Sequence, residues 1–512
     1  MEESNQFKRV IAHAKEYGFV FPSSEIYDGL SAVYDYGPNG VELKNNIKEY
    51  WWKAMVEGYQ EIVGIDSAIF MHPTTWKASG HIDAFNDPLI ENKDSNKRYR
   101  ADVLIENHIK KIEAKIQKEV FKATKKFGQQ FDRSTFINNN QRVIGYQNKI
   151  KEIQKRFSSS MKRGDLSELR LLIEECGIAC PDSGSKNWSD IKQFNLMFQT
   201  KLGAAQKSAS DLYMRPETAQ GIFLNYLNVQ KTSRLKIPFG IAQIGKAFRN
   251  EIVARQFIFR MREFEQMEMQ YFIPPGSQQE WYSFWKEARL KWHHAMGIDK
   301  ENYRFHDHIH LAHYADDATD IEFKFPFGFK ELEGIHSRTD FDLSSHQTFS
   351  GKKISYFDPF TNQTYTPFVI ETSIGLDRMF LAIYSACLKE QTLEDASKRI
   401  VFELPSFLAP VKLAILPLVN KEALVRLAQE INDKLQWEWA ISLDVKDTIG
   451  KRYRRQDAIG TPYCVTIDFD SLDDGKVTLR NRDSMKQERI AIDRIKQVVA
   501  HKVDMISALK TL

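Results

Sequence analysis

The sequence has few cysteines and no long apolar run. Its 512 residues include only four cysteines, Cys176, Cys180, Cys387 and Cys464, which are too few for a disulfide framework and are typical of a reducing compartment. No apolar run approaches the roughly eighteen residues that a membrane-spanning helix needs. The first residues, MEESNQFKRVIAHAKEYG, lack both the apolar core of a signal peptide and the acid-poor composition of a transit peptide. We therefore expect a cytoplasmic protein without a membrane partner.

A large excess of charge is also missing. The net charge of +4 is too small to indicate a polyanionic partner, and 42% hydrophobic with 27% charged residues is typical of a globular protein. Positive charge is concentrated locally, however. Residues 110–163 contain fifteen Lys or Arg against four Asp or Glu, and residues 451–455 read KRYRR. Either patch suits a phosphate backbone, although a solvated helix face is the commoner explanation for such a patch.

Composition divides the chain into three zones. Residues 1–100 and 191–400 contain segments such as QFIFRMREFEQMEMQYF, whose aromatic and β-branched residues predict an antiparallel sheet, and VELKNNIKEYWW, which predicts a flanking helix. Residues 101–190 are basic and poor in Pro and Gly, and they predict a largely helical insertion with a break near Asn138. Residues 405–512 alternate strand and helix patterns, which predicts a small α/β domain. The predicted fold class is therefore α+β.

The segment from Phe248 to Met269 concentrates the residues that could carry chemistry. It contains four arginines and four glutamates around the loop IVARQ. Residues two apart on a strand share a face. One face would then carry Arg260, Arg262, Phe264, Gln266 and Glu268, and the other Phe259, Glu263, Glu265 and Met267. The first face could hold a nucleotide triphosphate, with guanidinium on phosphate and ring on base. On spacing alone, a salt-bridged sheet surface is the simpler explanation.

The segment FRNEI-x-x-R-x-F-I-F-R-x-R-E-F-E-Q-M-E-M closely resembles motif 2 of the homodimeric glycyl-tRNA synthetases, a class II family. Other segments match the same family in order: YDYGPNGVELKNNIKEYWW with its motif 1, WKASGHIDAFNDPLI, RYRAD, RPETAQGIF, ELEGIHSRTDFDL, and VIETSIGLDR with its motif 3. The segment IGKRYRRQDAIGTPYCVTIDFD resembles the family's anticodon-binding domain. The resemblance implies a class II catalytic core at 1–100 and 191–400, a basic insertion at 101–190, an anticodon-binding domain at 405–512, and a homodimer.

The resemblance also implies an ATP site with two catalytic arginines. Arg249 would hold the α-phosphate and the attacking carboxylate, and Arg378 would hold the γ-phosphate of a bent ATP. Phe264 would stack on adenine, and Mg²⁺ would lie near Glu251 and Glu371. The ATP-binding residues implied are Arg249, Asn250, Glu251, Phe259, Arg260, Phe264, Glu331, Leu332, Gly375 and Arg378. Positioning and charge neutralisation are what phosphoryl chemistry requires of a protein.

The glycine pocket implied by the resemblance is rich in acids. Glu217, Glu268 and Glu371 with Ser373 would grip the ammonium group, while Arg338 and Arg100 would lie within reach of the substrate carboxylate. The full set is Arg100, Glu217, Phe264, Glu265, Gln266, Glu268, Arg338, Glu371, Ser373 and Gly375. Because glycine has no side chain, selection must rest on its two charges and on exclusion of larger amino acids. Taken singly, each residue could equally be part of an ordinary buried ion pair or a helix N-terminus.

Two further expectations concern metal and tRNA. Many relatives carry a zinc knuckle whose four cysteine positions correspond here to Asn92, Ser95, Cys180 and Ser183. One thiolate cannot form a four-ligand structural zinc site, so we expect no structural zinc. The residues proposed to contact tRNA are Arg255, Arg452, Arg454 and Arg455.

The predicted function is that of a glycine–tRNA ligase. It would use ATP and Mg²⁺ to form glycyl-adenylate and transfer glycine to the 3′ end of its tRNA. The resemblance also implies a side synthesis of diadenosine tetraphosphate, in which a second ATP attacks the adenylate. Two alternatives remain: a synthetase-like binding protein without catalysis, such as an accessory subunit of an organellar DNA polymerase, and a synthetase for a related amino acid. A binding protein would not need the combination of Arg249, Phe264 and Arg378. A synthetase for another amino acid is disfavoured by the acidic pocket.

Overall fold

The computed structural model describes residues 2–128, 131–203, 210–252, 256–308, 311, 314–393 and 396–512. The chain forms two compact units. The first comprises Met1–Ser79, Phe198–Arg249 and Ala254–Leu512, and the second comprises Gly80–Met197 with Asn250–Val253. The second unit therefore contains the predicted helical segment 101–190 together with residues on either side of it.

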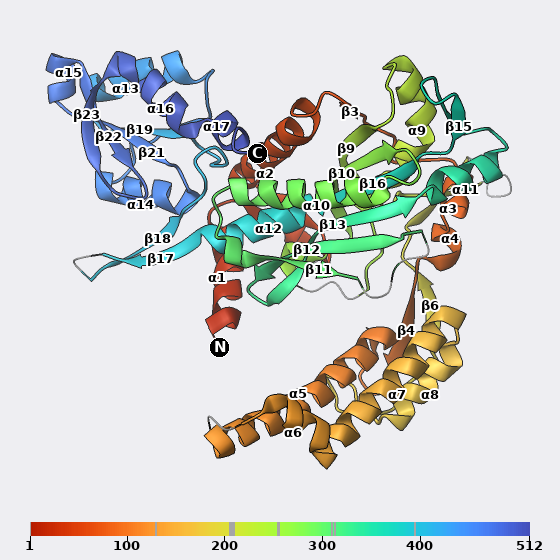
Figure 1. Cartoon of the computed structure of the whole chain (residues 1–512). Helices are drawn as coiled ribbons and strands as arrows, with labels where there is room; N and C mark the ends of the chain where they lie inside the picture. The colour runs from red at the N-terminus through yellow and green to blue at the C-terminus, as the bar shows by residue number, and fades with distance from the viewer. Residues whose placement is uncertain are drawn as a thin grey trace. The chain divides into compact units, whose positions relative to one another are not determined.

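A seven-stranded sheet forms the centre of the first unit (Figure 1). Its order is β11 (Tyr303–Asp307), β12 (Asp317–Phe325), β13 (Gly328–Thr339), β16 (Phe368–Gly375), β10 (Glu263–Ile273), β9 (Phe239–Phe248) and β3 (Ile62–Gly64). All neighbouring pairs are antiparallel except β3 and β9. The antiparallel sheet predicted from the aromatic, alternating segments is confirmed.

One face of this sheet is covered by three helices that share its core. They are α2 (Pro38–Trp52), α10 (Gln278–Ala295) and α12 (Leu376–Cys387). Met267 and Met269 of β10 lie in that core, whereas Phe272 packs with α9 (Ala219–Thr232). Since alternate side chains of a strand point to opposite faces, Gln266, Glu268 and Gln270 are directed away from α2 and α12. The helices thus leave one face of β10 for polar side chains.

Shorter elements surround the sheet. They are α1 (Glu2–Glu16), the pair β1 (Val20–Pro22) and β2 (Tyr34–Tyr36), α3 (Pro73–Ala78), the pair β7 (Gln199–Leu202) and β8 (Ser210–Tyr213), α11 (Phe341–Ser350), the pair β14 (Tyr356–Asp358) and β15 (Gln363–Tyr365), and the pair β17 (Leu388–Thr392) and β18 (Lys398–Phe402). Within the described ranges, no helix combines the length and the apolar character needed to cross a membrane.

The second unit is a helical bundle beside a small sheet. Its helices are α4 (His81–Ala84), α5 (Ala101–Phe127), α6 (Arg133–Asn139), α7 (Gln141–Arg163) and α8 (Leu166–Glu175), and its strands are β4 (Asn86–Asn92), β5 (Lys97–Arg100) and β6 (Lys192–Asn195). The helices α5, α7 and α8 pack side by side (Figure 1). Asn140 caps α7 by accepting hydrogen bonds from the amides of Arg142 and Val143. The predicted helices and the polar break between them are confirmed.

The C-terminal part of the first unit is a five-stranded mixed sheet with helices. The strand order is β20 (Ile441–Leu443), β19 (Leu413–Pro417), β21 (Tyr463–Ile467), β22 (Lys476–Asn481) and β23 (Gln487–Ala491). The helices are α13 (Glu422–Leu435), α14 (Ile449–Ile459), α15 (Asp470–Asp474), α16 (Ile495–Val503) and α17 (Met505–Leu509). β19 pairs in parallel with both of its neighbours. This confirms the predicted α/β character with a partly parallel sheet.

Candidate active site

Two buried carboxylates meet at the middle of the large sheet. Glu268 of β10 and Glu371 of β16 are 1% and 5% exposed. Gln270 lies between them: its Nε2 donates to Glu268 Oε1 at 2.8 Å and to Glu371 Oε2 at 2.7 Å. The structure therefore brings together two of the predicted glycine-binding acids, through an amide that is not predicted from the sequence.

Glu371 is surrounded by cationic and donor groups. Arg338 Nη1 lies 2.9 Å from Glu371 Oε2, and His336 Nδ1 lies 2.8 Å from Oε1. Burial alone would raise the pKa of Glu371, but the Arg338 guanidinium and His336 outweigh it and lower that pKa. Arg338 also forms a bidentate pair with Asp342, at 2.9 and 3.1 Å. Glu371 is consequently ionised, and Arg338 is occupied by two carboxylates.

Glu268 experiences the opposite environment. Burial first, and then the negative charges of Glu371 and Glu217, raise its pKa well above the ordinary value. Thr218, at the start of α9, donates its hydroxyl to Glu268 Oε2. Burial and the neighbouring negative charges therefore favour the protonated form of Glu268, whereas a cation entering between Glu268 and Glu371 would favour its ionisation.

The neighbouring predicted residues complete this polar face. Gln266 accepts from the Thr218 amide at 3.2 Å and donates to Ser373 Oγ at 3.2 Å. Glu217 is half-buried and accepts from Gln220 Nε2 at 3.1 Å. Gly375 pairs with Gln266 across β16 and β10. These contacts join the RPETAQG segment to β10 and β16.

A second predicted group lies where β9 ends. Arg249 Nε donates to the carbonyl oxygen of Pro216 at 3.1 Å. Its guanidinium carbon lies 5.3 Å from the centre of the Phe264 ring on β10. A planar base that stacks on Phe264 would therefore lie beside a guanidinium group.

Arg378 forms a third group at the start of α12. Its Nη1 lies 3.0 Å from Glu331 Oε2, its Nε donates to the Phe259 carbonyl at 3.3 Å, and its guanidinium lies 4.5 Å from the Phe259 ring centre. The Arg378 charge is the main cause that lowers the pKa of Glu331 to about 2. The Glu331 side chain is 53% exposed, so an ionised carboxylate beside Arg378 faces solvent.

A β-bulge separates Glu331 from the next acid of the same strand. Glu331 pairs with Glu322 and Glu333 pairs with Ile321, which leaves Leu332 as an extra residue. The Leu332 side chain lies in the helix-covered core, so only its backbone remains for the predicted contact with ATP. Glu333 is fully buried against α10, where it pairs with Arg289 at 2.5 Å and with His293 at 2.7 Å.

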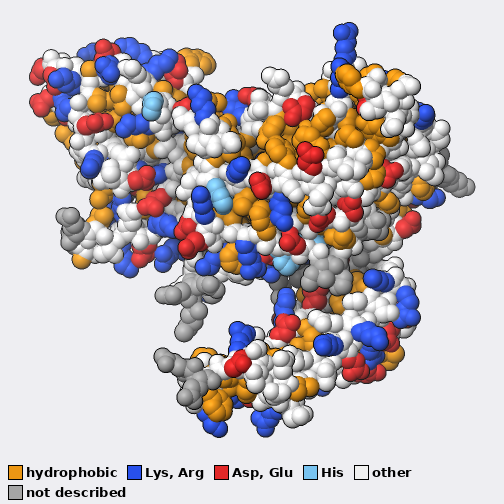
Figure 2. Space-filling view, in the orientation of Figure 1, with side chains coloured by type: hydrophobic (Ala, Val, Ile, Leu, Met, Phe, Trp, Pro, Cys, Tyr) orange, Lys and Arg blue, Asp and Glu red, His pale blue; other side chains and the backbone are white. Residues whose placement is uncertain are grey.

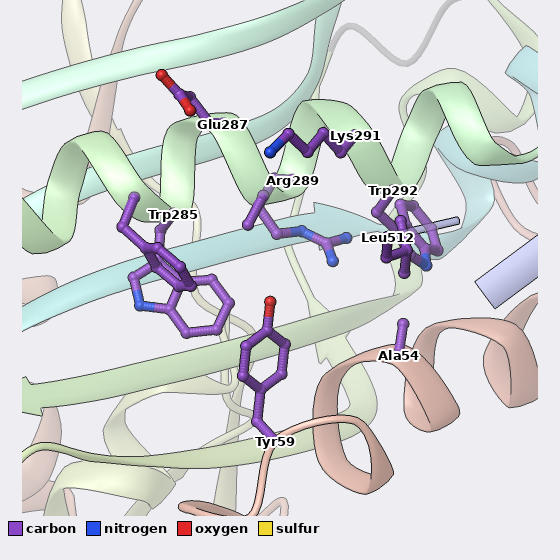
Figure 3. A pocket seen from close by; sticks show the side chains of 10 residues that line it. Ala54, Tyr59, Trp285, Glu287, Arg289, Lys291, Trp292 and Leu512 are labelled. Atoms are coloured by element: carbon purple, nitrogen blue, oxygen red, sulfur yellow. The ribbon is translucent and has the colours of Figure 1, made fainter. Parts of the chain in front are cut away.

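Arg289 also lines a cavity of about 120 Å³ on the α10 side of the sheet (Figure 3). Tyr59, Trp285 and Trp292 contribute to the same lining. The positive charge of Arg289 is already balanced by Glu333, so Arg289 does not offer this cavity a free charge for binding an anion. It lies on the opposite face of the sheet from Glu268 and Glu371.

Several predicted residues lie elsewhere. Glu265 points to the helix-covered face, where Lys44 and Lys48 lie 2.7 and 2.6 Å from its oxygens, so the structure does not bring its side chain to Glu268. Arg260 and Arg262 precede β10, which starts at Glu263, so the predicted strand face begins only at Phe264. Arg255 lies outside the described residues.

Three predicted residues belong to the second unit. Arg100 pairs there with Asp87 at 3.1 Å and with Asp102 at 2.6 Å. The Asn250 amide donates to the Leu196 carbonyl at 2.7 Å, and Glu251 is 8% exposed. Arg100 and Asn250 are therefore held by contacts within their own unit, and Glu251 is buried.

The basic cluster of α14 is only partly available at the surface. Arg452 is 1% exposed and donates to the carbonyls of Pro417, Leu418 and Asp444. It therefore supports the C-terminal sheet and does not present its charge to a partner. Arg455 pairs with Asp444 and Asp447 at 2.6 and 2.7 Å, whereas Arg454 is exposed.

The four positions that correspond to a zinc knuckle lie together. Asn92 Oδ1 accepts from Ser95 and Ser183, and Ser95 Oγ lies 3.6 Å from Cys180 Sγ. Burial opposes ionisation of Cys180, but hydrogen bonds from Ser183, Tyr99 and Ser95 lower its pKa to about 6. Among the residues that the structure describes, no three His, Cys, Asp or Glu side chains are grouped to hold a metal ion.

Arg215 is a buried residue that supports the backbone near the site, and it is not among the predicted site residues. It is 2% exposed and donates to the carbonyls of Lys246 and Ser67 at 2.6 and 2.8 Å. A Cβ atom on Gly245 would lie 2.3 Å from Arg215 Nη2, so only glycine leaves room for it. The sequence signal that points to this residue is its place at the start of the RPETAQG segment.

Known proteins resemble the whole chain. Residues 87–196 match the glycyl-tRNA synthetase insertion domain 1, residues 198–386 the tRNA synthetase class II core domain (G, H, P, S and T), and residues 412–502 the anticodon binding domain. The glycine–tRNA ligase of Chlorobaculum tepidum is 49% identical over 97% of this chain and 99% of its own. That of Macrococcus caseolyticus is 47% identical over 98% of this chain and 100% of its own.

Solved structures agree on the fold. A threonyl-tRNA synthetase structure from Cryptosporidium parvum aligns with a TM-score of 0.58 at 14% identity, covering 96% of both chains. The Giardia lamblia prolyl-tRNA synthetase aligns with a TM-score of 0.58 at 13% identity, covering 99% of this chain and 80% of its own. With the sequence matches, this similarity gives the family: the chain belongs to the glycine–tRNA ligases, with a class II synthetase core, an insertion domain and an anticodon-binding domain.

Proposed function

We propose that this protein activates glycine with ATP and transfers it to the 3′ end of its tRNA. The glycine carboxylate attacks the α-phosphorus, and the bond to the departing pyrophosphate breaks. A ribose hydroxyl of the tRNA then attacks the carbonyl carbon of the adenylate, and AMP leaves. The observation that carries this proposal is the buried Glu268–Gln270–Glu371 group on β10 and β16. Phe264 lies on the same β10, and Arg378 lies in the first turn of α12, which directly follows β16.

The ATP contacts follow from charge and shape. Phe264 offers a ring for adenine, and Arg249 and Arg378 offer guanidinium groups for phosphate oxygens. Arg378 would exchange its contact with Glu331 for the γ-phosphate, which carries more negative charge. Because the arginines are held by backbone carbonyls, they need little reorganisation when charge develops in the transition state.

Mg²⁺ bound with ATP would neutralise phosphate charge. Glu331 fits a place beside it, since this carboxylate is ionised and half-exposed. Glu251 is proposed for the same role by the resemblance. Glu371 fits less well, because Arg338, His336 and Gln270 already occupy its oxygens.

Glycine would bind with its ammonium group between Glu268 and Glu371, where it would replace the Gln270 amide as the donor to their oxygens. Both acids are buried, so an ammonium group there is attracted strongly, whereas an added methyl group would need space in a packed region. Glu217 and Ser373 border the same region. Selection by size needs no separate editing site.

Glycine-dependent exchange between ATP and labelled pyrophosphate tests the activity. We expect exchange with glycine and at least about 100-fold less with alanine or serine, the discrimination that one excluded group can provide. No exchange with any amino acid would favour a binding protein that has kept only the fold. Exchange with alanine or serine equal to that with glycine would refute the proposed specificity.

A homodimer is the proposed assembly. Ile26, Tyr27, Leu30 and Val41, at the start of the motif 1 region, are 87%, 78%, 57% and 41% exposed. Clustered exposed apolar side chains of this kind mark protein interfaces. Light scattering of the protein should give twice the chain mass, and the variant Ile26→Glu/Tyr27→Glu should shift it to the monomer. A monomeric parent protein would refute the assembly.

The second unit is the proposed contact for tRNA outside the anticodon domain. Lys115, Lys118, Lys122 and Lys125 are exposed along α5, and Figure 2 shows Lys and Arg side chains over the visible face of this unit. The variant Lys118→Glu/Lys122→Glu/Lys125→Glu should raise the KM for tRNA and weaken its salt dependence, while glycine-dependent exchange is unchanged. An unchanged KM for tRNA would refute the contact.

A further inference from the structure

A buried charged cluster lies on the opposite face of β10 from the proposed substrates. It consists of Tyr36, Lys44, Glu265 and Asp377. We infer that Lys44 is a positioning residue, which holds β10 and the start of α12 in the arrangement that places Phe264 and Arg378 around one ATP. This inference rests on the proposed function of those two residues.

Lys44 contacts two different motifs at once. Its Nζ lies 2.7 Å from Glu265 Oε2 on β10 and 3.1 Å from Asp377 Oδ1 on α12. The other Asp377 oxygen accepts the backbone amide of Glu265 at 2.8 Å. One ammonium group from α2 and one carboxylate from α12 therefore tie the same point of β10.

Tyr36 closes the cluster from β2. Its hydroxyl donates to Asp377 Oδ1, and its ring lies 4.0 Å from Lys44 Nζ. Burial alone would lower the pKa of Lys44, but Asp377 and Glu265 outweigh it and raise that pKa. The charged form of Lys44 is thus favoured, and it is enclosed by two carboxylates and an aromatic ring.

Each anchored residue is the immediate chain neighbour of a proposed ATP contact. Glu265 follows Phe264, and Asp377 precedes Arg378. Alternation along β10 puts Glu265 on the helix-covered face and Phe264 on the other. A shift of the Glu265 or Asp377 backbone would therefore move the ring or the guanidinium group directly. Displacements of about 1 Å at such a site reduce rates by up to about 100-fold.

In the part of the chain that the structure describes, Lys44 is the one cation paired with Asp377. Lys44, Glu265 and Asp377 have side-chain exposures of 7%, 11% and 4%. Lys48 lies 2.6 Å from Glu265 Oε1 and is 28% exposed, but the contacts that bind Asp377 come from Lys44, Tyr36 and the Glu265 amide. Removing the Lys44 charge would place two buried carboxylates together with one remaining lysine, which favours their separation.

Lys48 provides a matched control, because it contacts Glu265 from the same helix without contacting Asp377. We compare Lys44→Met with Lys48→Met by glycine-dependent ATP–pyrophosphate exchange, measuring kcat and the KM values for ATP and glycine. Lys44→Met should lower kcat/KM for ATP by about 10- to 100-fold, while the KM for glycine changes less than about threefold. Lys48→Met should lower kcat/KM for ATP by less than about threefold.

A purely structural role would affect both substrates alike. Equal losses for ATP and glycine in folded Lys44→Met, or unchanged values for both, would overturn the inference. If Lys44→Met does not fold, the double variant Lys44→Met/Glu265→Gln removes one charge of each sign. It should fold and still show the ATP-specific loss, since Asp377 is not held; a normal kcat/KM for ATP in it would overturn the inference. Absence of exchange in the parent protein would instead refute the proposed function.

Discussion

Glu268 and Glu371 are neighbouring buried carboxylates that accept from the same amide nitrogen of Gln270, yet their pKa values are displaced in opposite directions. Arg338 and His336 keep Glu371 charged. Burial, together with the charge of Glu371, favours the protonated form of Glu268. An ammonium group bound between them would favour the ionised form of Glu268, so substrate binding and proton release are linked.

This linkage predicts the pH dependence of glycine binding. Below the raised pKa of Glu268, binding must displace a proton, and above it the carboxylate is already charged. The KM for glycine in the exchange reaction should therefore fall as pH rises through that pKa. In Glu268→Gln the dependence should flatten and the KM should increase by about 10- to 100-fold, the value of a charged hydrogen bond. An unaltered KM in this variant would contradict the assignment.

The same substitution should not destabilise the fold at neutral pH. An acid whose folded-state pKa is raised above its unfolded value contributes stability at low pH, and this contribution is lost as pH rises toward the folded pKa. Because the glutamine side chain does not titrate, Glu268→Gln avoids this loss of stability. We expect the unfolding free energy of Glu268→Gln to exceed that of the parent protein, and the difference to grow as pH rises above the ordinary pKa of a glutamate toward the raised pKa. A pH-independent loss of stability, measured by denaturant unfolding, would contradict this.

Arg378 should matter most for ATP. Its guanidinium pairs with Glu331 and stacks on Phe259, a planar geometry that lysine cannot reproduce. Arg378→Ala should lower kcat/KM for ATP in the exchange reaction by about 100- to 1,000-fold, and Arg378→Lys should restore only part of it. Full activity in Arg378→Lys would show that a point charge suffices there. Thermal unfolding of both variants serves as the control for folding.

The alternation of β10 is the part of the site that sequence predicts best. The pattern from Phe264 to Glu268 places Gln266 and Glu268 on one face and Glu265 with Met267 on the other, as observed. The pattern fails before Glu263. Residues 257–259 form a short 3₁₀ helix there, and Gln256 and Phe257 have positive φ values of 75° and 56°. Such local backbone geometry leaves no two-residue periodicity to read.

Other features depend on tertiary contacts that periodicity does not contain. Strict alternation would put Glu331 and Glu333 on one face, but the bulge at Leu332 separates them. Arg452 belongs to a basic run that suggests exposure, yet three carbonyl acceptors at the ends of other elements hold it inside. Gln270 continues the polar face of β10, but its role depends on Glu371 from another strand.

The Glu333 network should be important for stability. Glu333 is fully buried with Arg289 and His293 as partners, and burial lowers the pKa of His293. Glu333→Met would leave the Arg289 charge buried without its partner, which costs about 3–5 kcal/mol of unfolding free energy. The double variant Arg289→Met/Glu333→Met should lose less, because no lone charge remains. Equal losses in denaturant unfolding would mean that packing, and not charge, governs this site.

The expected absence of structural zinc can be tested at the four positions that correspond to the zinc knuckle, which are Asn92, Ser95, Cys180 and Ser183. Three oxygen side chains and one thiol meet at these positions, with Asn92 Oδ1 accepting from both serines. Structural zinc needs four ligands, commonly four thiolates. If the parent protein lacks only the thiolate ligands, and not the backbone geometry of a zinc site, Asn92→Cys/Ser95→Cys/Ser183→Cys should bind about one zinc per chain. It should also gain thermal stability that a chelator removes.

The parent protein should contain far less than one zinc per chain, measured by mass spectrometry of metals. The matched control Asn92→Cys/Ser95→Cys supplies only three thiols and should hold zinc more weakly. Stoichiometric zinc in the parent protein would contradict the prediction from the sequence, and none in the triple variant would mean that the backbone no longer has the geometry of a metal site.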